Sequence, residues 1–209
     1  MNHLFLFILI LSGGLYLAGH YLEKPVLKYI FKPFTTLLII FFAFLQLPEV
    51  SVQYKVFILI GLILSLAGDI FLLWPEKSFV AGLIAFLLAH LLFILAITSD
   101  FGPYLDWEYL IPIALYMAIF LWIILPKSGK LVVPVIVYAL VLMLFFWQAA
   151  GRAFYLAGNN AMDALLGAGL FVVSDSLLAY NKFVKFSKWA ELFILITYWA
   201  AVYFIALSV

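Results

Sequence analysis

The sequence contains no cysteine and has few charged residues. Of its 209 residues, 10% are charged and 69% are hydrophobic. The missing cysteines exclude a disulfide framework, a thiolate nucleophile and a metal site with cysteine ligands. Lys and Arg number 11 against 10 Asp and Glu, and a net charge of +1 gives no electrostatic basis for binding nucleic acid. Soluble domains average about 25% charged and about 45–50% apolar residues, so this composition excludes one and indicates a membrane protein.

Long apolar runs divide the chain into segments that can span a bilayer. A helix needs roughly 17–25 residues to cross a hydrocarbon core of about 30 Å. The segments are continuously apolar and lack the alternation of a strand barrel, so we expect an all-α polytopic membrane protein with eight transmembrane helices in one integral membrane domain, 1–209. The expected spans are 4–22, 34–47, 56–74, 79–97, 109–125, 131–150, 164–180 and 192–208.

The first apolar segment, 4–22, begins close to the first residue. Only Asn2 and His3 precede it, without the positive region of a secretory signal peptide. It is also long enough to cross the bilayer. We therefore expect it to be a membrane span rather than a cleaved signal peptide.

The second segment, 34–47, is short for a span. It would have to thin the bilayer locally or extend through Lys32. Before it, Lys24, Lys28 and Lys32 recur every four residues from Pro25 onward. That spacing indicates either one or two turns of a helix lying on anionic headgroups, or three lysines that only set the topology.

Basic residues in the connections between spans predict the orientation. Nine of the 11 lie in odd-numbered connections, and only Lys55 and Arg152 lie in even-numbered ones. Because basic residues in short loops stay in the cytoplasm, we expect a multi-pass protein of the cell (inner) membrane with both termini outside the cytoplasm. The connection that contains Asp100, Asp106 and Glu108 has no basic residue, which suits the outer face. The nine are Lys24, Lys28, Lys32, Lys77, Lys127, Lys130, Lys182, Lys185 and Lys188.

A short similarity between the two halves indicates an internal repeat. Residues 61–73 and 167–179 align without a gap and place Asp69 opposite Asp175, each after a small residue. An offset of four spans preserves direction, so the halves would be parallel repeats of four spans each. Duplication and chance similarity both fit so apolar a background. Each aspartate lies five residues before the end of its expected span, which puts both about 7–8 Å from the cytoplasmic boundary.

Ionisable side chains inside the spans are the candidates for chemistry, because a charge in the bilayer interior is costly. Asp69, Asp175 and His90 are such residues. Two carboxyls at one depth in a low-dielectric cavity favour one protonated and one ionised group, which acid–base hydrolysis needs. The structural alternative is that each carboxyl only hydrogen-bonds a neighbouring helix. His90 lies roughly 9 Å deeper, where it either assists the carboxyls or donates to a backbone carbonyl.

Two polar residues follow Asp175 towards the cytoplasm and are candidates for substrate binding. Asn181 and Lys182 could receive a phosphate headgroup, although topology alone also explains the lysine. A histidine with two aspartates could bind Zn²⁺ or Fe²⁺. The sequence has no His-x-x-x-His pair, however, and we expect a site without metal.

The remaining polar residues of the spans have simpler structural roles. Gly68 and Ser174, beside the two aspartates, are expected to permit close helix approach rather than to act as nucleophiles. Tyr116, Tyr138 and Tyr198 are expected mainly to pack, with hydroxyls that need a partner, and one of them could line a cavity. No P-loop, Rossmann fingerprint or nucleophile elbow occurs in the sequence.

Two groups of residues surround the three candidates. They are Gly68-Asp69, Phe79, Gly82, Phe86 and His90, then Gly167, Phe171, Ser174-Asp175, Leu178-Ala179 and Asn181-Lys182-Phe183. This pattern resembles the YhhN family of integral membrane proteins, which includes lysoplasmalogenases. The resemblance implies that Asp69, His90 and Asp175 are the polar motif residues. It also implies hydrolysis of the vinyl-ether bond of a lysoplasmalogen, giving a fatty aldehyde and a glycerophospho-ethanolamine or -choline.

The implied reaction needs an acid, a stabilising anion and one water. We expect one aspartate to donate the proton and the other to stabilise the cation and activate water, with His90 reprotonating the acid or holding the water. The resemblance implies no metal and no organic cofactor. The expected partners are a lysophospholipid-type substrate and the lipid bilayer, with no nucleic acid.

A different function class fits the same residues. Parallel repeats with intramembrane carboxylates also describe a small proton-coupled transporter or a lipid-binding membrane protein. Such transporters pair two broken helices, whereas the prolines here lie mainly at the ends of spans, as Pro112 and Pro134 do. The sequence therefore favours the hydrolase.

Overall fold

The structure is a computed structural model that describes residues 3–105, 107–108, 110–156 and 158–209. Asp106 and Tyr109, which belong to the expected outer connection and the fifth expected span, lie outside the described residues. The described chain forms α-helices joined by short connections, with two 3₁₀ turns between α5 and α6. The helices are α1 (His3–Tyr21), α2 (Pro25–Leu45), α3 (Val52–Phe71), α4 (Pro75–Phe101), α5 (Leu110–Ile124), α6 (Val132–Leu156), α7 (Asn159–Phe183) and α8 (Lys188–Leu207).

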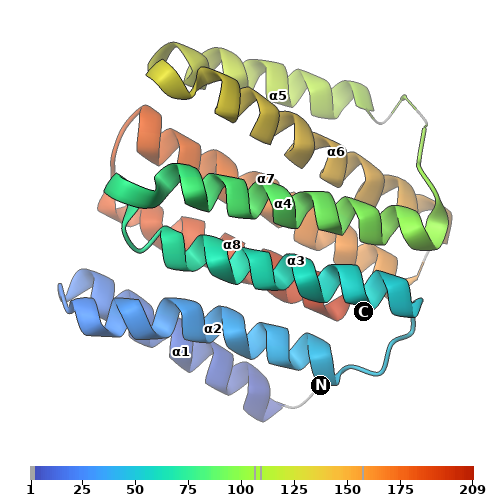
Figure 1. Cartoon of the computed structure of the whole chain (residues 1–209), viewed down its shortest axis with the longest axis horizontal. Helices are drawn as coiled ribbons and strands as arrows, with labels where there is room; N and C mark the ends of the chain where they lie inside the picture. Colours follow the sequence, from blue (N-terminus) through green and yellow to red (C-terminus); the bar gives the residue numbers. More distant parts are fainter. Residues whose placement is uncertain (1–2, 106, 109, 157) are drawn as a thin grey trace.

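The helices form one layered bundle. Eight helical segments of the described chain, α5 counted with the 3₁₀ turn after it, are long and apolar enough to cross a membrane. Helices α1 and α2 make one flank, α5 makes the other, and α3, α4, α7 and α8 lie between them beside α6 (Figure 1). The expectation of an all-α, multi-pass integral membrane protein is thereby confirmed.

Several helix ends follow from local sequence. Helices α2 and α4 begin with Pro25 and Pro75, where proline loses no helical hydrogen bond and its fixed φ suits the first turn. Ser51 caps α3, because its side-chain oxygen accepts a hydrogen bond from the Tyr54 amide at 3.1 Å. Helix α4 ends at Phe101 and is followed by Gly102, whose φ of 88° is unfavourable for other residues.

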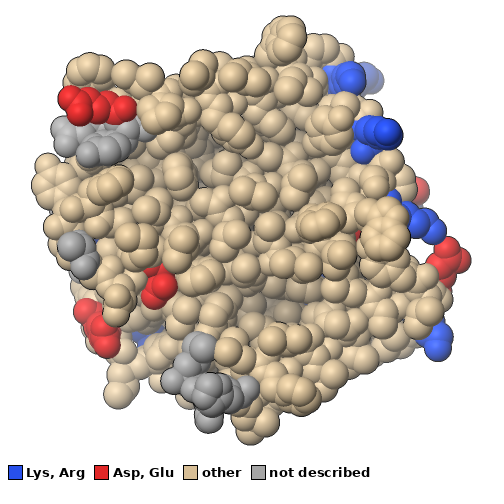
Figure 2. Space-filling model, turned by 180° about the vertical axis from the view of Figure 1, so that it is seen from behind, with Lys and Arg blue, Asp and Glu red and all other residues tan. Residues whose placement is uncertain are grey.

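The odd-numbered connections lie together at one end of the bundle, which we call the lysine-rich end, and the termini lie at the other (Figure 1). Most Lys and Arg side chains visible in Figure 2 line the edge formed by this end. Arg152 differs from expectation, because it lies within α6 rather than in a connection and is only 2% exposed. Its guanidinium lies 4.5 Å from the ring centre of Tyr54.

Helix α2 corrects the expected bounds of the second span and decides between the alternatives left open for it. It runs without a break for 21 residues, so the span is longer than 34–47 and extends through Lys32 and Pro33. No separate headgroup helix precedes it, and Lys32 is 6% exposed rather than lying in a loop. The lysine lies inside the bundle because a carboxylate from another helix pairs with its amine.

Small residues allow the central helices to approach closely. A Cβ atom at Gly61 would lie 2.4 Å from the Phe93 ring, and one at Gly68 would lie 2.5 Å from the Phe86 ring. Both rings belong to α4, so these glycines let α3 pack directly on it. Ser174 of α7 donates to the Ile194 carbonyl of α8 at 3.0 Å. The structural roles predicted for Gly68 and Ser174 are confirmed, whereas the internal repeat stays a prediction.

Candidate active site

A cavity of about 490 Å³ lies at the lysine-rich end, between α1, α2, α3, α4, α7 and α8. Its volume falls within the range of about 300–1,000 Å³ typical of ligand pockets. Charged groups of both signs line it, which is unusual for a site in a bundle of apolar helices. The charged lining residues are Lys28, Lys32, Asp69, Glu76, Asp175, Lys182 and Glu191.

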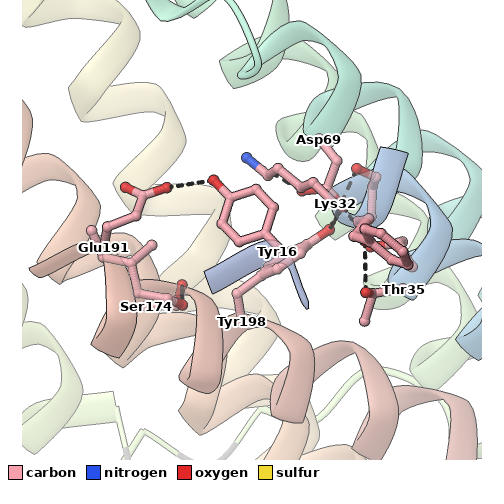
Figure 3. A network of polar contacts seen from close by, with 11 residues as sticks. Tyr16, Lys32, Thr35, Asp69, Ser174, Glu191 and Tyr198 are labelled. Carbon is pink, nitrogen blue, oxygen red and sulfur yellow. Dashed lines mark hydrogen bonds and ion pairs between the residues drawn. The ribbon is translucent and has the colours of Figure 1, made fainter. Parts of the chain in front are cut away.

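Asp69 lies near the end of α3 at the inner part of this cavity, and its side chain is 1% exposed. One carboxylate oxygen accepts hydrogen bonds from Thr36 at 2.5 Å and from Tyr198 at 2.7 Å. The other oxygen lies 3.8 Å from the amine of Lys32 (Figure 3). Every contact therefore comes from a donor or a cation, which is the environment of an ionised carboxylate.

Asp175 also lines the cavity, from α7, and is half-buried. Its single hydrogen bond among the described residues comes from the Tyr138 hydroxyl at 2.6 Å. The two aspartates are not equally spaced from their helix ends, since α3 ends at Phe71 and α7 continues to Phe183. The expectation of equal spacing was wrong because the end of an apolar run does not mark the end of a helix. Both carboxyls nevertheless line one cavity.

An apolar pocket adjoins the cavity at Asp175. It has a volume of about 50 Å³, lies among α4, α5, α6 and α7, and shares Phe79 and Phe86 with the cavity. Met117 lines this pocket and also an open apolar groove of about 480 Å³ on α5, α6 and α7. Asp175 thus lies where the polar cavity meets an apolar pocket.

The two predicted substrate-binding residues both line the cavity. Asn181 is 8% exposed, and its side-chain oxygen accepts a hydrogen bond from the Ser187 amide at 2.7 Å. This bond fixes the connection between α7 and α8. The amine of Lys182 lies 4.9 Å from the ring centre of Phe79, which also lines the cavity.

His90 is completely buried and does not line the cavity. Aromatic rings surround it, with the Phe171 ring centre at 4.9 Å and those of Tyr138 and Phe145 each at 5.5 Å. No hydrogen bond within the described part of the chain reaches either ring nitrogen. The structure therefore brings Asp69 and Asp175 to the cavity and places His90 outside it, in contact with the Tyr138 ring.

Sequence reasoning missed four partners of the aspartates. Lys32 was assigned to topology, although its four-residue spacing from Lys28 places both on one face of a helix, and both line the cavity. Thr36 could have been identified from the sequence, because it is a polar residue in an apolar helix and such a side chain needs a hydrogen-bond partner. Tyr138 and Tyr198 were expected mainly to pack, with hydroxyls that need a partner, and the structure shows that these hydroxyls donate to the two carboxyls.

The described part of the chain contains no group of three or more His, Asp and Glu side chains placed to hold a metal ion.

Comparison with known proteins gives a consistent family. The sequence model of the YhhN family matches residues 27–209. The protein named lysoplasmalogenase TMEM86B in Homo sapiens is 36% identical over 149 residues, which cover 71% of this chain and 61% of the human protein. Its namesake in Sus scrofa is 32% identical over 167 residues, covering 79% and 69%.

A bacterial relative is also similar. The membrane protein YhhN of Escherichia coli O157:H7 is 27% identical over 165 residues, covering 79% of this chain and 78% of that protein. The match to the human relative, by contrast, spans less than two thirds of that protein's length. No solved structure matches the chain significantly.

Proposed function

This chain belongs to the YhhN family, and from that membership and the geometry of its cavity we propose that it is a membrane-embedded hydrolase. Its proposed substrate is a lysoplasmalogen, a lysophospholipid whose single chain is joined by a vinyl ether. The products are a fatty aldehyde and a glycerophospho-ethanolamine or -choline. The names of the mammalian relatives support this substrate class.

The observation that best supports the proposal is one cavity with two carboxyls in different surroundings. Asp69 has a lysine and two hydroxyl donors, and we assign it as the anion. Asp175 has one hydroxyl donor, pairs with no cation among the described residues, and borders an apolar pocket. We assign Asp175 as the protonated acid, because a neutral carboxyl is the favoured form where no cation compensates its charge.

The proposed reaction begins at the β-carbon of the vinyl ether. Asp175 gives that carbon a proton, and the electron pair of the double bond forms the new C–H bond, leaving an oxocarbenium ion. Asp69 stabilises this cation and accepts a proton from the water that adds to its carbon. The resulting hemiacetal releases the glycerol hydroxyl and the aldehyde. A proton returned from Asp69 to Asp175 through cavity water resets the site.

His90 has a positioning role in this proposal. Its ring packs against the Tyr138 ring, and the Tyr138 hydroxyl donates a hydrogen bond to Asp175. Since His90 does not line the cavity, it holds the phenol that orients the acid rather than contacting substrate. This differs from direct proton delivery, which the sequence alone suggested.

The cavity also suits the two ends of the substrate. The phosphate lies among Lys28, Lys32 and Lys182 at the lysine-rich end, with Asn181 beside Lys182. The hydrocarbon chain follows the apolar pocket past Asp175 and leaves through the groove on α5, α6 and α7. We place the protein in the cell (inner) membrane. By the positive-inside rule its lysine-rich end faces the cytoplasm, and its termini face the other side.

Turnover of a synthetic lysoplasmalogen tests the proposal. Purified full-length protein in phospholipid vesicles is expected to release fatty aldehyde, measured by mass spectrometry. The matched 1-alkyl ether lysolipid is expected to release none, because a saturated ether has no β-carbon that accepts a proton. Failure to release aldehyde from the vinyl ether would contradict the proposal. Gradient-dependent accumulation of intact lipid in sealed vesicles, without aldehyde, would instead support the transporter.

A further inference from the structure

Glu191 faces the cavity without a cationic partner. It lies in the first turn of α8, lines the cavity and is half-buried. Its carboxylate accepts one hydrogen bond, from the Tyr16 hydroxyl at 3.1 Å (Figure 3). Within the described chain it forms no ion pair, since Lys188 pairs with Glu23 and Lys32 pairs with Asp69. A partly buried carboxylate in a polar cavity is a natural partner for a cation brought by a ligand.

Aromatic rings lie beside this carboxylate. Tyr16 and His20 are one turn apart on α1, both line the cavity, and their ring centres are 6.4 Å apart. No hydrogen bond from the described residues reaches either ring nitrogen of His20. The Tyr16 hydroxyl contacts the Glu191 carboxylate, and aromatic rings next to a carboxylate are an environment in which proteins bind organic ammonium groups, including choline.

Positive charge lies on the adjacent helix. Lys28 and Lys32 are one turn apart on α2, which lies beside α1, and both line the cavity (Figure 1). The cavity therefore presents a carboxylate with aromatic rings from α1 and α8 next to two amines from α2. This arrangement is complementary to a zwitterion that carries both an ammonium group and a phosphate.

We propose that Glu191, Tyr16 and His20 form an ammonium subsite that selects zwitterionic lysolipid headgroups over anionic ones. The inference rests on the proposed function for the lysolipid class and adds the part of the cavity that recognises the amine. The phosphate then lies among the cavity lysines, with Lys28 and Lys32 as its contacts on α2, and the ether end of the lipid points towards Asp69 and Asp175.

Glu76 is a less suitable partner for the amine. It also lines the cavity, but its side chain is exposed at the start of α4. Water and salt screen an exposed ion pair, so it contributes little to selection. Glu191 is therefore the residue to substitute.

Binding of 1-alkyl lysolipids to the purified full-length protein tests the subsite. These saturated ethers are not substrates, so calorimetry measures binding separately from hydrolysis. We expect phosphocholine lipid to bind about tenfold tighter than phosphoglycerol lipid of the same chain. Glu191→Gln is expected to remove this preference by weakening phosphocholine binding alone. Glu23→Gln, which removes an exposed carboxylate outside the cavity, is expected to keep it.

The outcomes separate the subsite from the proposed function. Equal binding of both headgroups by the wild type, or equal weakening of both by Glu191→Gln, would overturn the subsite. Glu191→Asp keeps the charge and is expected to retain the headgroup preference. It is the second variant to measure if Glu191→Gln does not fold. A headgroup preference that Glu191→Gln abolishes, in a protein that releases no aldehyde, would support the subsite and contradict vinyl-ether hydrolysis.

Discussion

Asp175→Asn is expected to lower the rate of aldehyde release by about 10²–10⁴-fold, the usual contribution of a general acid. Asparagine occupies the same space and can still accept the Tyr138 hydrogen bond, but it has no acidic proton to give to the β-carbon. Binding of the alkyl ether lysolipid should change little, because the substitution leaves the lysines and Glu191 in place. Single-turnover rates of aldehyde release, with binding measured alongside, check this expectation.

Asp163→Asn is the matched control for this experiment. Asp163 lies on the same helix, α7, and does not line the cavity. The same chemical change there is expected to leave turnover at the wild-type rate. Asp175→Asn protein that folds, binds lipid and turns over at the wild-type rate would remove Asp175 from the mechanism.

Asp69→Asn is expected to lower turnover by about 10²–10³-fold, as removal of a preorganised charge commonly does. The neutral amide neither stabilises the oxocarbenium ion nor accepts the proton from water. The substitution also leaves the amine of Lys32 buried without its partner, which costs about 3–5 kcal/mol of stability. Thermal unfolding and turnover are therefore both expected to change.

A double variant separates these two effects. Asp69→Asn with Lys32→Met removes both charges, while the amide oxygen can still accept from Thr36 and Tyr198. Its unfolding temperature is expected to return towards that of the wild type, because replacement of a whole buried ion pair is often neutral. Turnover is expected to stay low. Recovery of turnover together with stability would show that Asp69 is only structural.

The eight spans could be predicted from sequence because length and hydropathy determine which segments lie in a bilayer. The extents of α2 and α6 could not be predicted in this way. Lys32 interrupts an apolar run in the sequence, yet it continues α2 because Asp69 of another helix pairs with it. Arg152 likewise lies inside α6 rather than in a loop. When the partner of a buried charge lies on another helix, the sequence around the charge does not reveal that partner.

The candidate site divides in the same way. Scarcity of charge identified Asp69 and Asp175, and the structure places both at one cavity. The same criterion identified His90 but could not predict its aromatic surroundings, because the rings around it come from α4, α6 and α7. Glu191 lies at the end of a span, where a carboxylate usually faces water, and only the fold shows that Tyr16 holds it in the cavity.

Hydrolysis in D₂O tests the central claim, protonation of the β-carbon, most directly. Lysoplasmalogen turned over by the purified protein is expected to give aldehyde with one deuterium on the carbon next to the carbonyl, read by mass spectrometry. Free aldehyde incubated with the protein in D₂O for the same time corrects for exchange after release. Aldehyde without deuterium at that carbon would contradict proton transfer to the vinyl ether, and with it the roles given to Asp175 and Asp69.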